Sequence, residues 1–170
     1  MDISIEAAKS GEYEILKNLL EKYVYELSQY FGMDVNDLGL YGCNYLDYYF
    51  SEEKRHPFFI KVDNKLAGFI LVSDYPEGTK TTDYTLSEFF VMYKYRRNGV
   101  GKYSVKYILD KLKGTWQLKF HPNNDISKQF WMKTIEEYTN GKYELIKDDP
   151  HPDAVLDDEG TIGHILIFES

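Results

Sequence analysis

The residues with the clearest chemical potential stand together where an apolar segment gives way to a basic turn rich in glycine: Glu88-Phe89-Phe90-Val91-Met92-Tyr93-Lys94-Tyr95-Arg96-Arg97-Asn98-Gly99-Val100-Gly101-Lys102. Gly99 and Gly101 let the backbone approach a ligand without interference from a Cβ atom. The N–H groups in the first turn of a helix attract anions, and Arg96, Arg97 and Lys102 add positive charge. This combination predicts a strand, a loop that binds a pyrophosphate, and a helix.

Spacing separates this loop from two common phosphate-binding motifs. A nucleotide P-loop needs a glycine four intervening residues before its Gly-Lys pair and a Ser or Thr directly after it, but these positions hold Arg96 and Tyr103. The dinucleotide motif G-x-G-x-x-G needs a third glycine where Ser104 stands, and an acidic residue near Lys119-Phe120, where there is none. The remaining alternatives are the pattern R-x-x-G-x-G and a plain turn between a strand and a helix.

The sequence after the loop adds a second pattern. Apolar and small residues at intervals of three and four predict a helix over residues 99–113, which ends at Gly114. The alternation in Trp116-Gln117-Leu118-Lys119-Phe120 predicts a short strand. Asn124 then begins the pattern N-x-x-S-x-x-F-W, which runs through Ser127, Phe130 and Trp131.

These two patterns together resemble the GNAT superfamily of N-acetyltransferases. The R-x-x-G-x-G pattern of Arg96, Gly99 and Gly101 is similar to the family's acetyl-CoA loop, and the pattern that begins at Asn124 is similar to its second characteristic region. The match covers residues 58 to 135. Residues 23 to 72 also resemble a subgroup of uncharacterised bacterial acetyltransferases, through the following short sequences: Tyr41-Gly42, His56-Pro57-Phe58 and Gly68-Phe69.

The resemblance implies a site for acetyl-CoA as cosubstrate. The phosphates would bind the loop residues Arg96, Arg97, Asn98, Gly99, Val100, Gly101 and Lys102. The pantetheine arm would lie in a splay between the strand before the loop and the strand after its helix, with Asn124 at its amide groups. Backbone N–H groups of Phe90 or Val91 would polarise the thioester oxygen.

Glu88 is the predicted catalytic residue. Acetyl transfer to an amine requires a neutral nitrogen and a thioester carbonyl held within reach, so positioning supplies much of the acceleration. Similar enzymes often place a carboxylate in the strand that leads to the phosphate loop, where Glu88 stands. A buried carboxylate has a raised pKa and can accept the amine proton near neutral pH. The alternative is a carboxylate at the strand edge that faces solvent.

One position departs from the family pattern. Many relatives carry a tyrosine seven residues after the asparagine, and its hydroxyl protonates the departing thiolate. This chain has Trp131 there, and indole cannot serve as that acid. Either another tyrosine such as Tyr138 or Tyr143 replaces it, or the thiolate leaves without an acid, since thiols ionise near neutrality.

The composition predicts a cytoplasmic enzyme with a single acetyltransferase domain over residues 1–170. A chain of this length can bury a proper core. No apolar run approaches the roughly 20 residues that a membrane helix requires, and the N-terminus does not have the pattern of a secretory signal. Cys43 is the one cysteine, which suits a reducing compartment, and it is expected to pack rather than to react.

Charge and histidine spacing limit the expected partners. A formal charge of −8 argues against nucleic acid, whose phosphates bind basic surfaces. The four scattered histidines lack the spacing of metal ligands. The predicted partners are acetyl-CoA and the amine of a small molecule or a protein, without a metal, nucleic acid or a membrane, and association into a homodimer is left open. The acidic run from Asp148 to Glu159 is expected to be a solvated loop, or else to attract a cationic amine.

The remaining patterns predict an α/β (α+β) fold. A strand at Ile3–Ala7, a helix with Ser10 as N-cap that ends at Gly32, and an aromatic helix over residues 41–50 come first. The later elements are a hairpin of residues 58–62 and 66–72, a strand over residues 84–93, and terminal strands over 142–147 and 162–168. The order β-α-α-β-β-β-α-β-α-β-β is the one the resemblance implies, with a mixed, mostly antiparallel sheet and helices on both faces.

Two functional classes follow from these predictions. The favoured class is an acetyl-CoA-dependent N-acetyltransferase, in which the amine attacks directly in a ternary complex. The alternative is a domain of the same fold that binds a CoA ester as a sensor or partner module without turnover. Glu88 distinguishes the two classes, because only the enzyme needs a base. A transferase of longer acyl groups is a third alternative, which depends on the volume of the pocket.

Overall fold

The computed structural model describes every residue from Met1 to Ser170, and they form two compact units. The first unit contains Met1–Val72 and Glu88–Val105, and the second contains Ser73–Ser87 and Lys106–Ser170. Two of the boundaries fall well inside an element, so the strand Tyr84–Val91 (β4) and the helix Val100–Lys111 (α3) each run from one unit into the other.

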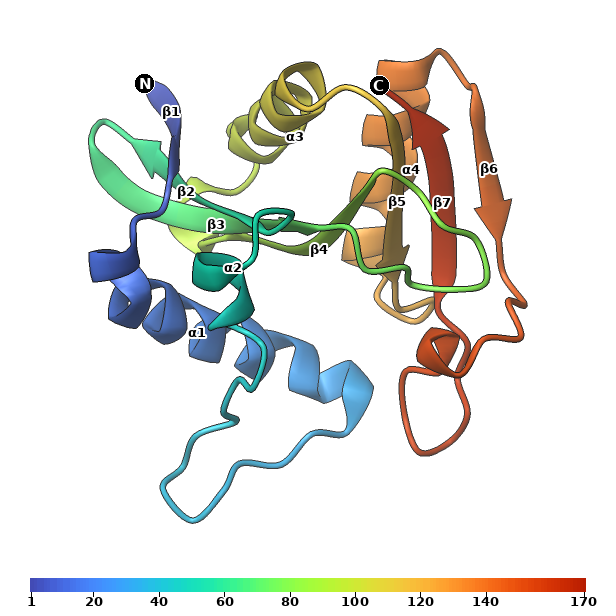
Figure 1. Cartoon of the computed structure of the whole chain (residues 1–170), viewed down its shortest axis with the longest axis horizontal. Helices are drawn as coiled ribbons and strands as arrows, with labels where there is room; N and C mark the ends of the chain where they lie inside the picture. The colour runs from blue at the N-terminus through green and yellow to red at the C-terminus, as the bar shows by residue number, and fades with distance from the viewer. The chain divides into compact units, whose positions relative to one another are not determined.

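The elements follow the predicted order (Figure 1). The other strands are β1 (Ile3–Ala7), β2 (His56–Val62), β3 (Lys65–Ser73), β5 (Thr115–Phe120), β6 (Tyr143–Ile146) and β7 (His164–Glu169). The other helices are α1 (Tyr13–Phe31), α2 (Tyr48–Ser51) and α4 (Asp125–Thr139). None of the four helices combines the length and the apolar character needed to cross a bilayer.

The strands form one sheet in the order β1-β2-β3-β4-β5-β7-β6. The pairs β1/β2, β2/β3, β5/β7 and β6/β7 are antiparallel, and β4 pairs with β5 in parallel. The parallel pairing joins Tyr84 to Trp116 and Thr85 to Gln117. The predicted mixed, mostly antiparallel sheet is therefore confirmed.

The predicted hairpin of β2 and β3 is also confirmed. Its turn contains Asp63 and Asn64, whose φ angles of 50° and 62° lie in the left-handed region. Two such residues in succession match the twist of a two-residue hairpin turn. The backbone N–H of Asp2 donates to the Asp63 carboxylate at 2.8 Å, so the turn also fixes the start of β1.

The prediction of a helix over residues 41–50 is wrong for most of its length. The helix covers only Tyr48–Ser51. The preceding segment is not helical: the Glu21 carboxylate accepts hydrogen bonds from the N–H groups of Tyr41 and Gly42, at 2.9 and 2.8 Å, and residues 44–47 form bends and turns. Gly42 has a φ of 76°, which is incompatible with a right-handed helix at that residue.

The start of α1 differs from its prediction, whereas its end does not. Ser10 is the first residue of a short 3-10 helix, Ser10–Glu12, rather than the N-cap of α1, which begins at Tyr13. At the other end Gly32 has a φ of 63°, and its N–H donates to the Ser28 carbonyl at 3.0 Å. Glycine is favoured in this cap because it has no Cβ atom.

In the first unit, α1 packs its apolar stripe against one face of β2 and β3. The buried residues of this cluster are Leu16, Leu19, Leu20, Leu46, Tyr49, Phe59, Phe69, Leu71 and Phe90. Tyr23 of α1 lies against both Phe69 and Phe90, with ring centroids 5.6 and 5.9 Å apart. Because Phe90 belongs to β4, this aromatic group connects α1 to the strand that carries Glu88.

In the second unit, β5 supplies the largest fully buried side chain, Trp116, which stacks on Tyr84 at a centroid distance of 4.9 Å. Its indole N–H donates to the Leu112 carbonyl at 3.0 Å. Gln117 next to it is also buried, and its side chain pairs with the Glu77 N–H and the Thr82 hydroxyl, both at 2.8 Å. These contacts satisfy the polar atoms that burial removes from water.

At Gly68 in β3, the backbone of β4 lies too close to leave room for a side chain. A Cβ atom at this position would lie 1.9 Å from the Phe90 carbonyl oxygen and 3.1 Å from the Cα atom of Val91. Both obstructing atoms belong to the backbone, so they cannot move as a flexible side chain would.

We therefore expect Gly68→Ala to lower the stability by about 1–3 kcal/mol, because the added methyl forces two strands apart. Thermal or urea unfolding measures the effect. Gly11→Ala is the matched control, since a Cβ atom at Gly11 has no heavy atom within 4 Å. An equal stability of the two variants would contradict the close approach.

Candidate active site

The predicted phosphate loop lies between β4 and α3 in the first unit. A 3-10 helix, Tyr93–Tyr95, follows β4, and α3 begins at Val100. Between them the chain turns sharply, with φ angles of 62° at Arg97 and 77° at Gly99. A Cβ atom at Gly99 would have no heavy atom within 4 Å, so the positive φ, rather than crowding, favours glycine there.

Arg96 is held by protein partners. Its guanidinium donates to both carboxylate oxygens of Glu26 in α1, at 2.8 and 2.6 Å, and its Nε donates to the Val91 carbonyl at 2.6 Å. The guanidinium also stacks on the Tyr93 ring, 4.1 Å from its centroid. Bidentate bonds between charged groups are strong and directional, so Arg96 ties the loop to α1.

The backbone at the start of α3 offers N–H groups that the helix itself does not use. The N–H of Tyr103 donates to the Gly99 carbonyl at 2.9 Å, which is the first bond of the helix. The N–H groups of Val100 and Gly101 precede it and have no acceptor within the helix, and such groups bind anions. Arg97 and Lys102 are exposed beside them. The Asn98 side chain donates to the Arg96 carbonyl at 3.1 Å and helps to hold the turn.

Glu88 lies in β4 with an intermediate exposure, and Phe90 and Val91 beyond it are buried. The hydroxyl of Tyr45 donates to the Glu88 carboxylate oxygen Oε1 at 2.9 Å. Glu88 is therefore neither fully buried nor a carboxylate that simply faces solvent. Both residues belong to the first unit, as does the phosphate loop.

Asn124 belongs to the second unit and is the N-cap of α4. Its side-chain oxygen accepts a hydrogen bond from the Ser127 N–H at 3.0 Å. The spacing of Asn124 and Ser127 in the sequence pattern thus has a structural role, since this bond satisfies an N–H group of the first helical turn. The contact of Asn124 with pantetheine stays a prediction.

Trp131 is buried in α4, where its ring lies 4.8 Å from that of Phe130. Of the two alternative acids, Tyr138 has its hydroxyl between Asp110 and Lys113, at 2.9 and 3.1 Å. Burial is the largest influence on the phenols of Tyr138 and Tyr143 and raises the pKa of both. A higher pKa makes a phenol a weaker proton donor.

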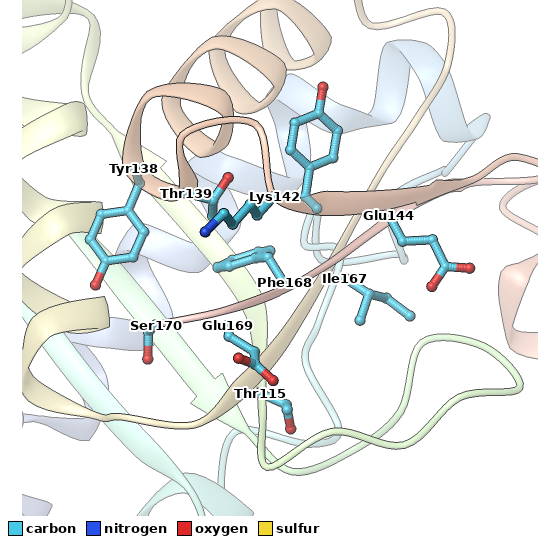
Figure 2. A pocket seen from close by; sticks show the side chains of 10 residues that line it. Thr115, Tyr138, Thr139, Lys142, Glu144, Ile167, Phe168, Glu169 and Ser170 are labelled. Atoms are coloured by element: carbon cyan, nitrogen blue, oxygen red, sulfur yellow. The ribbon is translucent and has the colours of Figure 1, made fainter.

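Tyr138 and Tyr143 both line a hollow of about 690 Å³ in the second unit, which Figure 2 shows from close by. Its other lining residues are Thr115, Thr139, Lys142, Glu144, Ile167, Phe168, Glu169 and Ser170. Several polar groups here bond within the protein: Glu144 pairs with Lys80, and the Ser170 hydroxyl donates to the carbonyls of Leu112 and Gly114. Apart from these two alternative acids, neither Glu88, Asn124 nor any residue of the predicted phosphate loop lines the hollow, so the candidate site rests on the loop and Glu88 instead.

Three of the six carboxylates in the run from Asp148 to Glu159 accept hydrogen bonds from other groups of the protein. Asp149 is buried and accepts hydrogen bonds from the N–H and hydroxyl of Thr79, at 3.0 and 2.7 Å. Although burial raises its pKa, these bonds lower it more, and the net shift is downward. Asp153 accepts from the Tyr75 hydroxyl and Asp157 from the Thr161 N–H, at 2.8 and 2.9 Å.

The carboxylates of this run that are exposed are Asp148, Asp158 and Glu159. The other three are buried or partly buried, which weakens the expectation that the whole run recruits a cationic acceptor. The structural carboxylates have no sequence signal that separates them from the exposed ones, because their partners lie up to 78 residues away in the chain.

Sequence comparison identifies a family. A model of the acetyltransferase (GNAT) family matches residues 20–136, which is more than half of the chain. A comparison with proteins of curated function finds none that matches.

Solved structures share the fold at low sequence identity. An acetyltransferase from Thermus thermophilus is 14% identical, with a TM-score of 0.64 over 100% of this chain and 98% of its own. The PaiA N-acetyltransferase from Thermoplasma acidophilum, solved in complex with coenzyme A, is also 14% identical, with a TM-score of 0.62 over 100% of both chains. Arabidopsis thaliana Naa50, solved with the bisubstrate analogue CoA-Ac-MVNAL, is 14% identical, with a TM-score of 0.58 over 100% of both chains.

Proposed function

Because this chain belongs to the acetyltransferase (GNAT) family and is an acyltransferase, we propose that it transfers an acetyl group from acetyl-CoA to a primary amine. The amine attacks directly within a ternary complex. The observation that carries the proposal is the turn at Gly99, which opens α3 with N–H groups that have no acceptor within the helix.

The loop binds the diphosphate of the cosubstrate through the N–H groups of Val100 and Gly101, with Arg97 and Lys102 as flanking charges. Arg96, a further predicted cofactor-binding residue, donates to Glu26, and we propose that this pair holds the loop in shape. Asn98 supports the same turn. A further proposed donor is the N–H of Phe90 or Val91, at the thioester oxygen.

Acetyl-CoA supplies a thioester, an activated acyl group with a good leaving group. Glu88 accepts the proton of the attacking amine, directly or through a water molecule, as the carbon–nitrogen bond forms. The carbon–sulfur bond breaks, and its electron pair leaves on the sulfur as a thiolate. No protein acid is required, since a thiol ionises near neutral pH. Glu88 then returns its proton to solvent.

The acceptor is an amine of a small molecule or of a protein. We place the reaction in the cytoplasm, in line with the single cysteine. We also propose that residues 1–170 act as a single acetyltransferase domain, because β4 and α3 each run through both compact units.

A panel of amines tests the function. The protein is incubated with acetyl-CoA and, in separate reactions, polyamines, aminoglycosides, lysine peptides and peptides with free N-termini. Release of the CoA thiol is recorded, and each product is weighed by mass spectrometry. We expect one class to gain 42 mass units, the mass of an added acetyl group, at a rate well above hydrolysis. Binding of acetyl-CoA without transfer to any class would favour the non-catalytic module.

A further inference from the structure

The segment between α1 and α2 places the hydroxyl of Tyr45 next to Glu88, the proposed base. The segment leaves α1, extends outward and returns to the β2–β3 hairpin of the same unit (Figure 1). On its return Leu46 is fully buried, and Tyr45 packs against the same core cluster. The Tyr45 hydroxyl then donates to Oε1 of Glu88 at 2.9 Å, across 43 residues of sequence.

The approach of Tyr45 is fixed from both sides. On the N-terminal side of Tyr45, the N–H groups of Tyr41 and Gly42 donate to the carboxylate of Glu21 in α1, at 2.9 and 2.8 Å. Four residues after it, Tyr49 is buried in the core, and its ring lies 6.4 Å from that of Tyr45. A side chain that is locked by packing and hydrogen bonds can hold a functional group in a defined geometry.

The surroundings keep Tyr45 protonated. Burial, and next the negative charge of Glu88, raise the pKa of the Tyr45 phenol far above its ordinary value. Two other titratable groups face this phenol, Tyr23 and Cys43. Burial also raises the pKa of the Cys43 thiol, and the Glu88 charge adds to this shift. Tyr45 thus keeps its proton and donates it in the hydrogen bond to Glu88.

We propose that Tyr45 is a positioning residue for Glu88, whose hydroxyl orients the carboxylate and holds it in its ionised form. A donor bonded to a carboxylate stabilises the charged state over the protonated one. It also fixes the rotation of the carboxylate, so that the base meets the amine in one orientation. This inference rests on the proposed function, in which Glu88 accepts the amine proton.

Tyr45→Phe tests the inference, since it removes one oxygen atom and keeps the ring in the core. Loss of the donor makes Glu88 easier to protonate. We therefore expect the acid limb of the pH profile of kcat/KM to move upward by about one to two pH units, the shift that corresponds to one hydrogen bond to a charged group. Activity at the low-pH end falls by about tenfold for each unit, and most of it returns on the high-pH plateau.

Tyr49→Phe is the matched control. It removes a phenol from the same region, and the hydroxyl that is lost bonds to Arg55 rather than to Glu88. We expect the control to leave the acid limb in place, whatever its effect on the melting temperature. If both variants moved the limb equally, the effect of Tyr45 would be general packing and the inference would fail.

A second measurement separates this inference from the proposed function. The protonation of Glu88 is followed by NMR of ¹³C-labelled glutamate carboxyl groups, assigned through Glu88→Gln, in the absence of any acceptor. An upward shift in Tyr45→Phe supports the inference, even where no amine is acetylated, in which case the proposed function alone fails. An unchanged titration overturns the inference.

Discussion

Gly101→Asp abolishes the rise in melting temperature that acetyl-CoA gives to the wild-type protein. A ligand at a hundredfold excess over its Kd adds about 2.7 kcal/mol of stability, which for a chain of this length corresponds to roughly 5–10 °C. The new carboxylate would stand in the first turn of α3, where the backbone N–H groups are proposed to meet the pyrophosphate. Repulsion between the two anions removes the binding that produces the shift.

Differential scanning fluorimetry at millimolar acetyl-CoA measures this effect. Gly11→Asp is the matched control, because it adds the same charge at an exposed glycine where a Cβ atom meets nothing within 4 Å. The control should keep the full shift. A wild-type protein that is not stabilised, or a Gly101→Asp variant that is stabilised as much as the control, would contradict the assignment of the loop.

Glu88→Gln lowers kcat by about 10²- to 10⁴-fold, the usual contribution of a positioned general base. Affinity for acetyl-CoA changes little, because the loop that is proposed to bind it lies beyond the end of β4. The acid limb of the pH–rate profile disappears as well, since glutamine has no proton to lose near neutral pH. Steady-state kinetics across pH with an acceptor from the amine panel, together with the thermal shift, separates turnover from binding.

Glu144→Gln is an informative control for this experiment. Glu144 lines the hollow in Figure 2 and pairs with Lys80 on the surface, so its loss should leave turnover intact. If Glu144→Gln lost activity and Glu88→Gln retained it, the active site would lie at the hollow in the second unit. Retention of wild-type kcat/KM by Glu88→Gln at every pH would make Glu88 structural.

Local signals in the sequence predict most of the fold. The order of the elements follows from apolar patterns with the period of a strand or of a helix. Their ends follow from residues that favour a left-handed φ, which are Gly32 after α1 and Asp63 and Asn64 in the hairpin turn. The wrong helix over residues 41–50 shows the limit of these signals. Its aromatic spacing is compatible with a helix, but Gly42 has a left-handed φ and the distant Glu21 carboxylate binds the N–H groups of Tyr41 and Gly42.

The candidate site likewise has one part that could be predicted from the sequence and one part that could not. The glycine turn and its charged neighbours are adjacent in the sequence, so their grouping could be predicted. The partner of Arg96 could not, because Glu26 lies 70 residues away, and a basic residue in the loop pattern gives no sign that a carboxylate of α1 already binds it. The contact of Tyr45 with Glu88 could not be predicted either. Nothing in the sequence distinguishes this tyrosine from the other fifteen, and only the folded chain brings its hydroxyl to Glu88.

The ion pair between Glu26 and Arg96 has a further consequence for the mobility of the phosphate loop. Exposed loops usually open locally at almost no cost in free energy, whereas helices with a buried face open only near the limit of global unfolding. To open while α1 stays folded, the loop must break both hydrogen bonds between Arg96 and Glu26. The ion pair therefore raises the free energy of local opening of this short glycine turn above that of an untethered exposed loop, because it ties the turn to a nineteen-residue helix.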